Sequence, residues 1–196
     1  MSPKTIIFFG PSGSGKGTQA SLLKEYLKQK DSKQEVIYVE TGDRFRKFIE
    51  SDTHTSALTK DTLAHGGLLP EFLPIWIWTG FFIDNIKGGE HLILDGLARR
   101  VPEAPVLDGA LRFYNREKPD VILLDVSDAE AFSRLKKRGR HDDNDKEIKI
   151  RLDWYKTDVE LAIAFFRENS YYNFHDINGE QTVSEIHKEI ITKLNL

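Results

Sequence analysis

Short apolar runs alternate with segments of helical spacing along most of the chain. The runs lie at 6–9, 36–39, 92–94, 121–124 and, more weakly, 173–177. Runs of this length predict strands that are covered on both faces, as in a parallel sheet. Helical spacing is found between them at 19–30, 129–138, 145–169 and 183–194. This alternation predicts an α/β fold in three layers (α/β/α), with a five-stranded parallel sheet between helices.

Two stretches interrupt the alternation. Residues 41–90 are mostly helical in pattern, and residues 138–144 form a short connection. With 196 residues in all, one domain over 1–196 is expected. We assign the core to 1–40, 91–137 and 145–196, and treat the two insertions as candidate mobile flaps.

Composition narrows the class of protein. The formal charge of −3 and a pI near 6.1 argue against a surface that coats nucleic acid. The chain has no cysteine, which fits a reducing compartment. Its most apolar later stretch, 68–83, is interrupted by two prolines and a glutamate and is shorter than the roughly 20 residues that span a bilayer. A cytoplasmic protein without nucleic-acid or membrane partners is expected.

The sequence GPSGSGKGT at 10–18 follows the first predicted strand and precedes a helix. Glycines in this setting let the backbone amides converge on a phosphate, the helix N-terminus favours an anion, and Lys16 reaches the terminal phosphates. Gly17 occupies the position where a phosphate-binding (P-) loop usually has the magnesium-binding Ser or Thr. A magnesium ion would therefore be held mainly by phosphates and water.

Two carboxylates could orient that water. Asp95 ends the predicted strand 92–94, at the sheet edge where the phosphate loop begins. Asp43 could share this task, although a helix cap or a turn is an equally good interpretation of an aspartate at that position.

Five motifs in order resemble the adenylate kinase family of nucleoside monophosphate (NMP) kinases. They are GKGTQ at 15–19, TGDRFR at 41–46, GGLLP at 66–70, DGLAR at 95–99 and the arginines from Arg134 to Arg151. The resemblance covers nearly the whole chain. It implies a P-loop NTPase fold with a helical NMP-binding insertion at 41–90 and a very short lid at 138–144.

The resemblance also implies roles for individual residues. ATP would be bound by Gly13, Ser14, Gly15, Lys16, Gly17, Thr18, Arg134, Arg138 and Gln181. The monophosphate, most simply AMP, would be bound by Thr41, Arg46, Gly67, Leu68, Leu69, Gly96, Arg99, Glu103, Arg140 and Arg151. Catalysis would rest on Lys16, Arg99, Arg134, Arg138, Arg140 and Arg151, with Mg²⁺ on ATP and Asp43 and Asp95 acting through water. A monomer is implied.

The need for several arginines has a chemical reason. The transferring phosphoryl group spreads negative charge over its oxygens, and arginine grips phosphate in a bidentate fork. Taken alone, the basic run 134–140 would be only a solvated helix end. His141 and the acids after it suggest a metal site, but pairing with the arginines and capping of the helix from Asp145 are the interpretations we favour.

The base of the acceptor is the open question at this stage. The family usually has glutamine where this chain has Glu103, and an ionised glutamate can only accept hydrogen bonds. Thr41 favours AMP, whereas a UMP/CMP kinase or a kinase of another nucleoside monophosphate is the alternative. Glu103 could also face solvent or pair with Arg100. A nucleotide-binding module without turnover is a further alternative, against which the full set of arginines argues.

Two smaller features complete the picture. Arg138 and Arg140 are separated only by Gly139, so the lid is shorter than in short-lid members of the family, and we hypothesise futile ATP hydrolysis. Five aromatic residues could wall the acceptor pocket, but their helical spacing is more typical of core; they are Phe72, Trp76, Trp78, Phe81 and Phe82.

Overall fold

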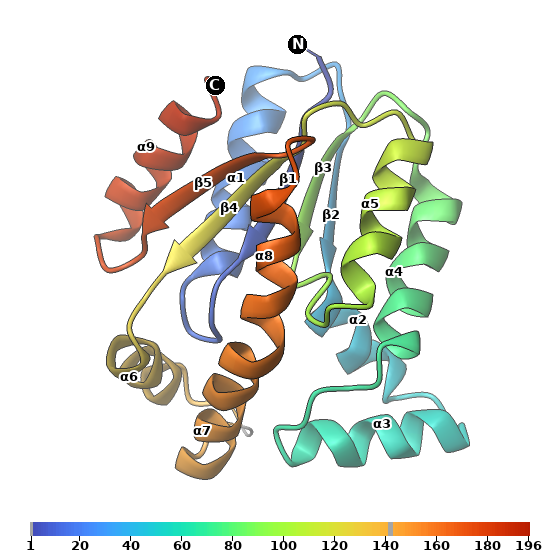
Figure 1. The fold of residues 1–196 in the computed structure, drawn as a ribbon, viewed down its shortest axis with the longest axis vertical. Helices are drawn as coiled ribbons and strands as arrows, with labels where there is room; N and C mark the ends of the chain where they lie inside the picture. The colour runs from blue at the N-terminus through green and yellow to red at the C-terminus, as the bar shows by residue number, and fades with distance from the viewer. Residues whose placement is uncertain (1, 141–142) are drawn as a thin grey trace.

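Five parallel strands form a single sheet at the centre of the molecule (Figure 1). The computed structural model describes residues 2–140 and 143–196. The strands are β1 Thr5–Phe9, β2 Val36–Glu40, β3 His91–Asp95, β4 Asp120–Asp125 and β5 Asn173–Asn178. Their spatial order is β2-β3-β1-β4-β5. The predicted number, direction and positions of the strands are confirmed.

Helices connect consecutive strands. They are α1 Lys16–Lys30, α2 Thr41–Phe48, α3 His54–Ala64, α4 Phe72–Asn85, α5 Glu103–Phe113, α6 Asp128–Arg138, α7 Asp145–Trp154, α8 Glu160–Glu168 and α9 Val183–Lys193. The segment predicted as one helix over 145–169 is divided, because a π-helical turn, η1 Tyr155–Val159, joins α7 to α8. None of the helices in the described ranges is long and apolar enough to cross a membrane.

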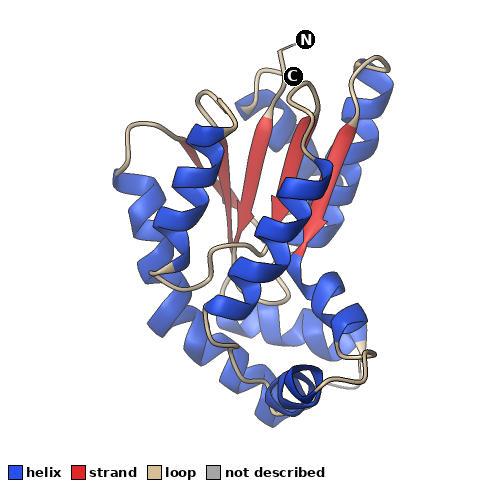
Figure 2. Ribbon diagram, turned by 90° about the vertical axis from the view of Figure 1, so that its right-hand side faces the viewer, coloured by secondary structure: helices blue, strands red, loops and turns tan. Residues whose placement is uncertain are grey.

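The sheet separates two apolar layers, and Figure 2 shows the strands with helices on either side. On one face, Ile7, Leu94 and Val121 pack with residues of α4, α5 and α8. On the other, alternate strand residues such as Ile6 and Ile93 pack with α1 and α9. Successive side chains of a strand point to opposite sides of the sheet, so both faces carry apolar side chains, and helices cover both. The three-layer prediction is confirmed.

The segment 41–90 contains α2, α3 and α4. A small core of Phe45, Leu69 and Leu73 holds its first part together. The second half of α4 belongs to the main core, where Trp78 and Phe82 are almost fully buried beside the sheet. The segment that stands away from the sheet therefore consists of α2, α3 and the start of α4, with α3 farthest from it (Figure 1).

The carboxyl ends of the strands bring the sequence motifs together. Phe8 of β1 pairs in register with Asp95 of β3, and Asp95 pairs with Glu40 of β2. The phosphate loop follows β1 directly, and the segment from 41 follows β2. Since all strands are parallel, these loops emerge at one edge of the sheet, where α/β proteins bind ligands.

Candidate active site

The loop between β1 and α1 has the backbone of a phosphate cradle. Gly10, Gly13 and Gly15 all have positive φ, at 142°, 86° and 95°. A Cβ on Gly13 would lie 2.5 Å from the carbonyl oxygen of Ala131 in α6, so only glycine fits there. Helix α1 starts at Lys16, and its N-terminus therefore faces the loop.

Lys16 lies inside this cradle. Its Nζ donates hydrogen bonds to the carbonyl oxygens of Gly10 at 2.7 Å and Pro11 at 2.9 Å. Burial of the ammonium group lowers the pKa of Lys16 to about 8. The negative charge of Asp95 acts in the opposite direction and raises this pKa. Lys16 borders a cavity that is also lined by Gly96, Arg99 and Trp154.

Asp95 faces the phosphate loop as predicted. A Cβ on Gly17 would lie 3.5 Å from Asp95 Oδ2, so the glycine leaves the carboxylate close to the start of α1. Tyr38 donates its hydroxyl to the same oxygen at 3.1 Å. Burial raises the pKa of Asp95, and the charge of Lys16 works in the opposite direction. Asp95 and Lys16 therefore act on each other's pKa at the carboxyl edge of the sheet.

Asp43 lies differently. Its carboxylate is exposed on α2 and pairs with Lys47 at 2.9 Å and with Arg46 at 3.5 Å. These two partners lie one helical turn further on, so Asp43 stabilises its own helix. Within the described ranges, no group of three or more His, Cys, Asp or Glu residues could hold a metal ion. His141 and Asp142 lie outside the described residues.

Arg134 joins the two loops assigned to ATP. Its guanidinium donates to the carbonyl oxygens of Ser14 at 3.2 Å and Gly179 at 2.9 Å, and Glu130 fixes it at 2.7 Å. Gly179 belongs to the loop between β5 and α9. In the same loop the Gln181 amide donates to Asn178 and Glu189, at 3.2 and 2.8 Å. The side-chain nitrogen of Gln181 is therefore engaged within its own loop and helix α9.

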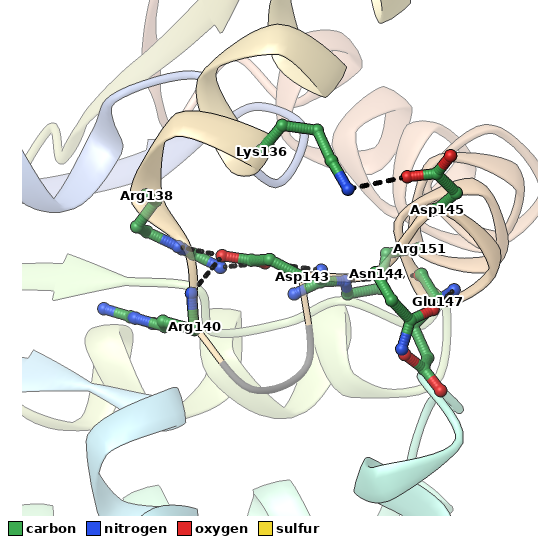
Figure 3. Close-up of polar contacts among 8 residues, drawn as sticks. All are labelled: Lys136, Arg138, Arg140, Asp143, Asn144, Asp145, Glu147 and Arg151. Carbon is green, nitrogen blue, oxygen red and sulfur yellow. Dashed lines mark hydrogen bonds and ion pairs between the residues drawn. The ribbon is translucent and has the colours of Figure 1, made fainter.

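Asp143 gathers the arginines that flank the lid (Figure 3). Arg138 donates to both of its carboxylate oxygens at 2.9 and 2.8 Å, and Arg151 donates at 2.8 Å. Burial alone would raise the pKa of Asp143, but the hydrogen bonds from Arg138 and Arg151 outweigh it and hold the pKa well below its usual range. The predicted pairing of this acid with the arginines is confirmed.

The rest of the lid connection follows ordinary helix-end chemistry. Gly139 ends α6 in the left-handed conformation, with φ 65°. Asn144 caps α7 by accepting from the backbone N–H of Glu147 at 3.1 Å, which is the capping predicted from sequence. Arg140 gives its backbone N–H to Asp143, whereas its side chain extends away from that carboxylate in Figure 3.

On the acceptor side, Arg99 is held beside the phosphate cradle. Its Nε donates to the carbonyl oxygen of Gly96 at 2.9 Å, and its guanidinium lies 6.0 Å from the ring centre of Trp154. Arg46 lies on α2 and pairs with Glu40 at 2.8 Å. Both arginines thus lie near the carboxyl ends of β2 and β3. Arg99 lines the cavity, so an anion bound there would contact Arg99.

The turn at 66–70 is tied to the core across the cavity. Trp154 donates its indole N–H to the carbonyl oxygen of Gly66 at 3.0 Å, and Arg100 reaches the carbonyl oxygen of Leu68 at 3.5 Å. Leu69 is buried in the small core of the insertion. No sequence signal had pointed to Trp154, whose place on α7, three residues after Arg151, brings it to this turn.

Glu103 is buried rather than exposed, with 1% of its surface accessible, so the solvent-facing interpretation is wrong. Its Oε1 accepts from the backbone N–H of Arg100 at 3.1 Å, while the Arg100 guanidinium turns toward Leu68 and Asp158. Burial raises the pKa of Glu103 to about 7. Thr41 is also buried, and its hydroxyl forms no hydrogen bond with the described residues.

The aromatic residues of α4 lie in three kinds of surroundings. Trp78 and Phe82 are core residues, which confirms the reading of their helical spacing. Phe72 and Trp76 are more than half exposed. Phe81 is covered by the guanidinium of Arg44, 3.6 Å from the ring centre. None of the five lines the cavity around Lys16.

Comparison with known proteins defines the class to which this fold and site belong. A family model described as adenylate kinase matches residues 8–171. The chain belongs to the adenylate kinase family, and it is an ATP-dependent phosphotransferase with a phosphate group as acceptor.

Similar curated proteins span nearly the whole chain. An adenylate kinase of Azobacteroides pseudotrichonymphae is 33% identical over 97% of this chain and 96% of its own length. One from Prochlorococcus marinus (strain MIT 9515) is 34% identical over 92% of this chain and 94% of its own length. One from Leptospira biflexa is 33% identical over 97% and 100%.

Proposed function

We propose that the protein transfers the terminal phosphoryl group of ATP directly to AMP and so forms two molecules of ADP. One observation carries this proposal: Lys16 and Arg99 line one cavity at the carboxyl edge of the sheet, and the charge of Asp95 acts on both of them. Such an array can hold two phosphate groups between a cationic cradle and an arginine. The names of the relatives supply the acceptor, since each is called an adenylate kinase.

The donor side follows from the cradle. The backbone amides of 13–18 would receive the ATP phosphates, and Lys16 would exchange its two carbonyl partners for phosphate oxygens. Arg134 and the backbone near Gln181 would border the base and ribose. Arg138 would turn from Asp143 toward the phosphates as the lid closes.

The acceptor side follows from Arg99. We assign its guanidinium, with Arg46, to the phosphate of AMP, and Arg140 and Arg151 to the phosphate groups on both sides of the transfer. Thr41, Gly67, Leu68, Leu69, Gly96 and Glu103 would surround the nucleoside. The acceptor phosphate is itself the nucleophile, so no protein base is assigned and no phosphoenzyme is formed.

Magnesium fits the site only through water and phosphate. Asp95 supplies a carboxylate next to Gly17, and oxygen is the ligand type that Mg²⁺ prefers. Gly17 offers no side-chain ligand, and Asp43 is engaged by Lys47 and Arg46. The ion would neutralise charge on the ATP phosphates. Water molecules held by Asp95, and by Asp43 when α2 approaches, would orient the ion.

The division into core, insertion and lid belongs to the same proposal. The part of 41–90 that stands away from the sheet would close over AMP, and 138–144 would close over ATP. A monomer in the cytoplasm is proposed on family membership.

The experiment is ADP formation from Mg-ATP and AMP by the wild type, Lys16→Ala and Lys28→Ala. Lys28 lies on the same helix but is exposed and pairs with the exposed Glu25, so it is a matched control. Loss of Lys16 should lower kcat by on the order of 10²–10³-fold, since it removes a charged donor from the developing phosphoryl charge. Equal activity of the three proteins would refute the site assignment.

A further inference from the structure

Glu103 carries a buried carboxyl group that takes no part in the phosphoryl transfer step itself. Its Oε1 accepts from the Arg100 N–H, but Oε2 is covered and forms no hydrogen bond with any residue that the structure describes. A buried ionised oxygen without a partner is costly. The geometry therefore favours a proton on Oε2 and a ligand atom that accepts a hydrogen bond from it.

The charges around Glu103 compete. Burial favours the neutral form, whereas Arg99 and Arg100, both in the segment between β3 and α5, favour the ionised form. Asp158 of η1 lies 3.7 Å from the Arg100 guanidinium and offsets part of its charge. Burial prevails, and the pKa of Glu103 is about 7. A phosphate on Arg99 would neutralise the stronger opposing charge, so ligand binding would raise this pKa further.

The position of Glu103 suits the base end of the acceptor. Arg99, which borders the cavity with Lys16, is near enough for its charge to act on Glu103. Arg100 extends from the same segment to the carbonyl oxygen of Leu68 in the turn at 66–70. Glu103 thus feels the charge of Arg99, which is assigned to the acceptor phosphate, and is bonded to Arg100, whose side chain reaches the turn assigned to the nucleoside. Oε2 is covered, so a base reaches it once neighbouring side chains have shifted.

We propose that Glu103 recognises the acceptor base as a neutral carboxylic acid, donating Oε2–H to N1 of adenine and accepting at Oε1 from the exocyclic amine. This rests on the proposed function and adds its specificity. A neutral acid offers a donor beside an acceptor, as a primary amide does. A carboxylate only accepts; it would oppose the lone pair of adenine N1 and would suit the adjacent N–H donors of guanine.

Proton-dependent recognition has a measurable consequence. Above the pKa of about 7, AMP binds only after Glu103 takes up a proton, so its apparent affinity falls as pH rises. Between pH 6 and pH 8, KM for AMP should increase about tenfold in the wild type. Glu103→Gln supplies donor and acceptor at every pH, so its KM for AMP should remain at the low-pH value of the wild type.

The test compares KM for AMP and GMP from pH 6 to pH 8 in the wild type and Glu103→Gln. The ratio of the two proteins at each pH cancels the titration of the substrate phosphate and of Lys16. The proposal predicts a ratio for AMP that grows with pH and a wild-type preference for AMP over GMP that shrinks. Parallel profiles would overturn it. Failure to phosphorylate AMP at any pH would instead refute the proposed function.

Calorimetry of the wild type alone gives a second readout. At pH 8, binding of AMP in buffers of different ionisation enthalpy should reveal uptake of nearly one proton, clearly more than binding of GMP. Both ligands carry the same phosphate, so the difference isolates the base. Equal proton uptake with AMP and GMP would overturn the role of Glu103, whether or not the variant folds.

Discussion

At the scale of single residues, close backbone contacts decide what the phosphate loop tolerates. Gly13→Ala would place a methyl group 2.5 Å from the carbonyl oxygen of Ala131, at a φ of 86°. The backbone of α6 would have to move, and the loop geometry with it. We expect a loss of about 2 kcal/mol in unfolding free energy and weaker ATP binding. Urea unfolding and nucleotide titration measure the two effects.

Gly109→Ala is the matched control. Gly109 lies within α5, and a Cβ there would meet nothing within 4 Å. Alanine favours a helix over glycine by up to about 1 kcal/mol, so this variant should be neutral or slightly more stable. Similar destabilisation of both variants would contradict the steric explanation.

Residues also show where reasoning from sequence ends. The spacing of arginines and glycines indicated the site because each motif is local. The burial of Glu103 depends on the packing of α5 against α4, α8 and the sheet, and no local pattern reports it. The same holds for Trp154, which reaches that turn across 88 residues of sequence.

At the scale of elements, the junction of α6 and α7 depends on Asp143. Its side chain is fully covered and holds Arg138 and Arg151 together. Asp143→Asn removes the negative charge that Arg138 and Arg151 share, and we expect a loss of about 2 kcal/mol at pH 7. Asp145→Asn is the control, because Asp145 is mostly exposed where it pairs with Lys136 and should matter little.

The pH dependence of this effect follows from the depressed pKa of Asp143. A carboxyl whose pKa is lower in the folded protein contributes stability above its unfolded pKa, near 4, and loses it as pH falls further. The stability difference between wild type and Asp143→Asn should therefore shrink below about pH 4. Urea midpoints at pH 7 and pH 3 test this; an unchanged difference would exclude the ion pair as the cause.

Elements differed in how far the sequence predicted them. Strands covered on both faces gave continuous apolar runs, and these were found. Strand β5 gave a weak run because only Ile177 is buried along it, whereas β2 at the other edge of the sheet has three buried residues. Helix α5 was not predicted, since Pro105 and Gly109 disguise it; Pro105 lies in the first turn, where a missing N–H costs little.

At the scale of the whole molecule, the short lid raises the question of water. Only residues 139–144 join α6 to α7, which limits how far the lid can cover the phosphates. We expect slow release of inorganic phosphate from Mg-ATP in the absence of an acceptor, above the level of Lys16→Ala. A phosphate-release assay measures it. Negligible ATPase activity would show that the short lid still excludes water.

The most direct test of the whole account is ADP formation from Mg-ATP with AMP, CMP, UMP, GMP and dTMP as separate acceptors at pH 6, below the pKa of Glu103. Lys16→Ala provides the blank. The account predicts a strong preference for AMP, because a neutral Glu103 and Thr41 complement adenine. Preference for another base would keep the phosphoryl-transfer site and contradict the assignment of the acceptor. Turnover of none of the five would contradict the proposed phosphoryl transfer to a nucleoside monophosphate.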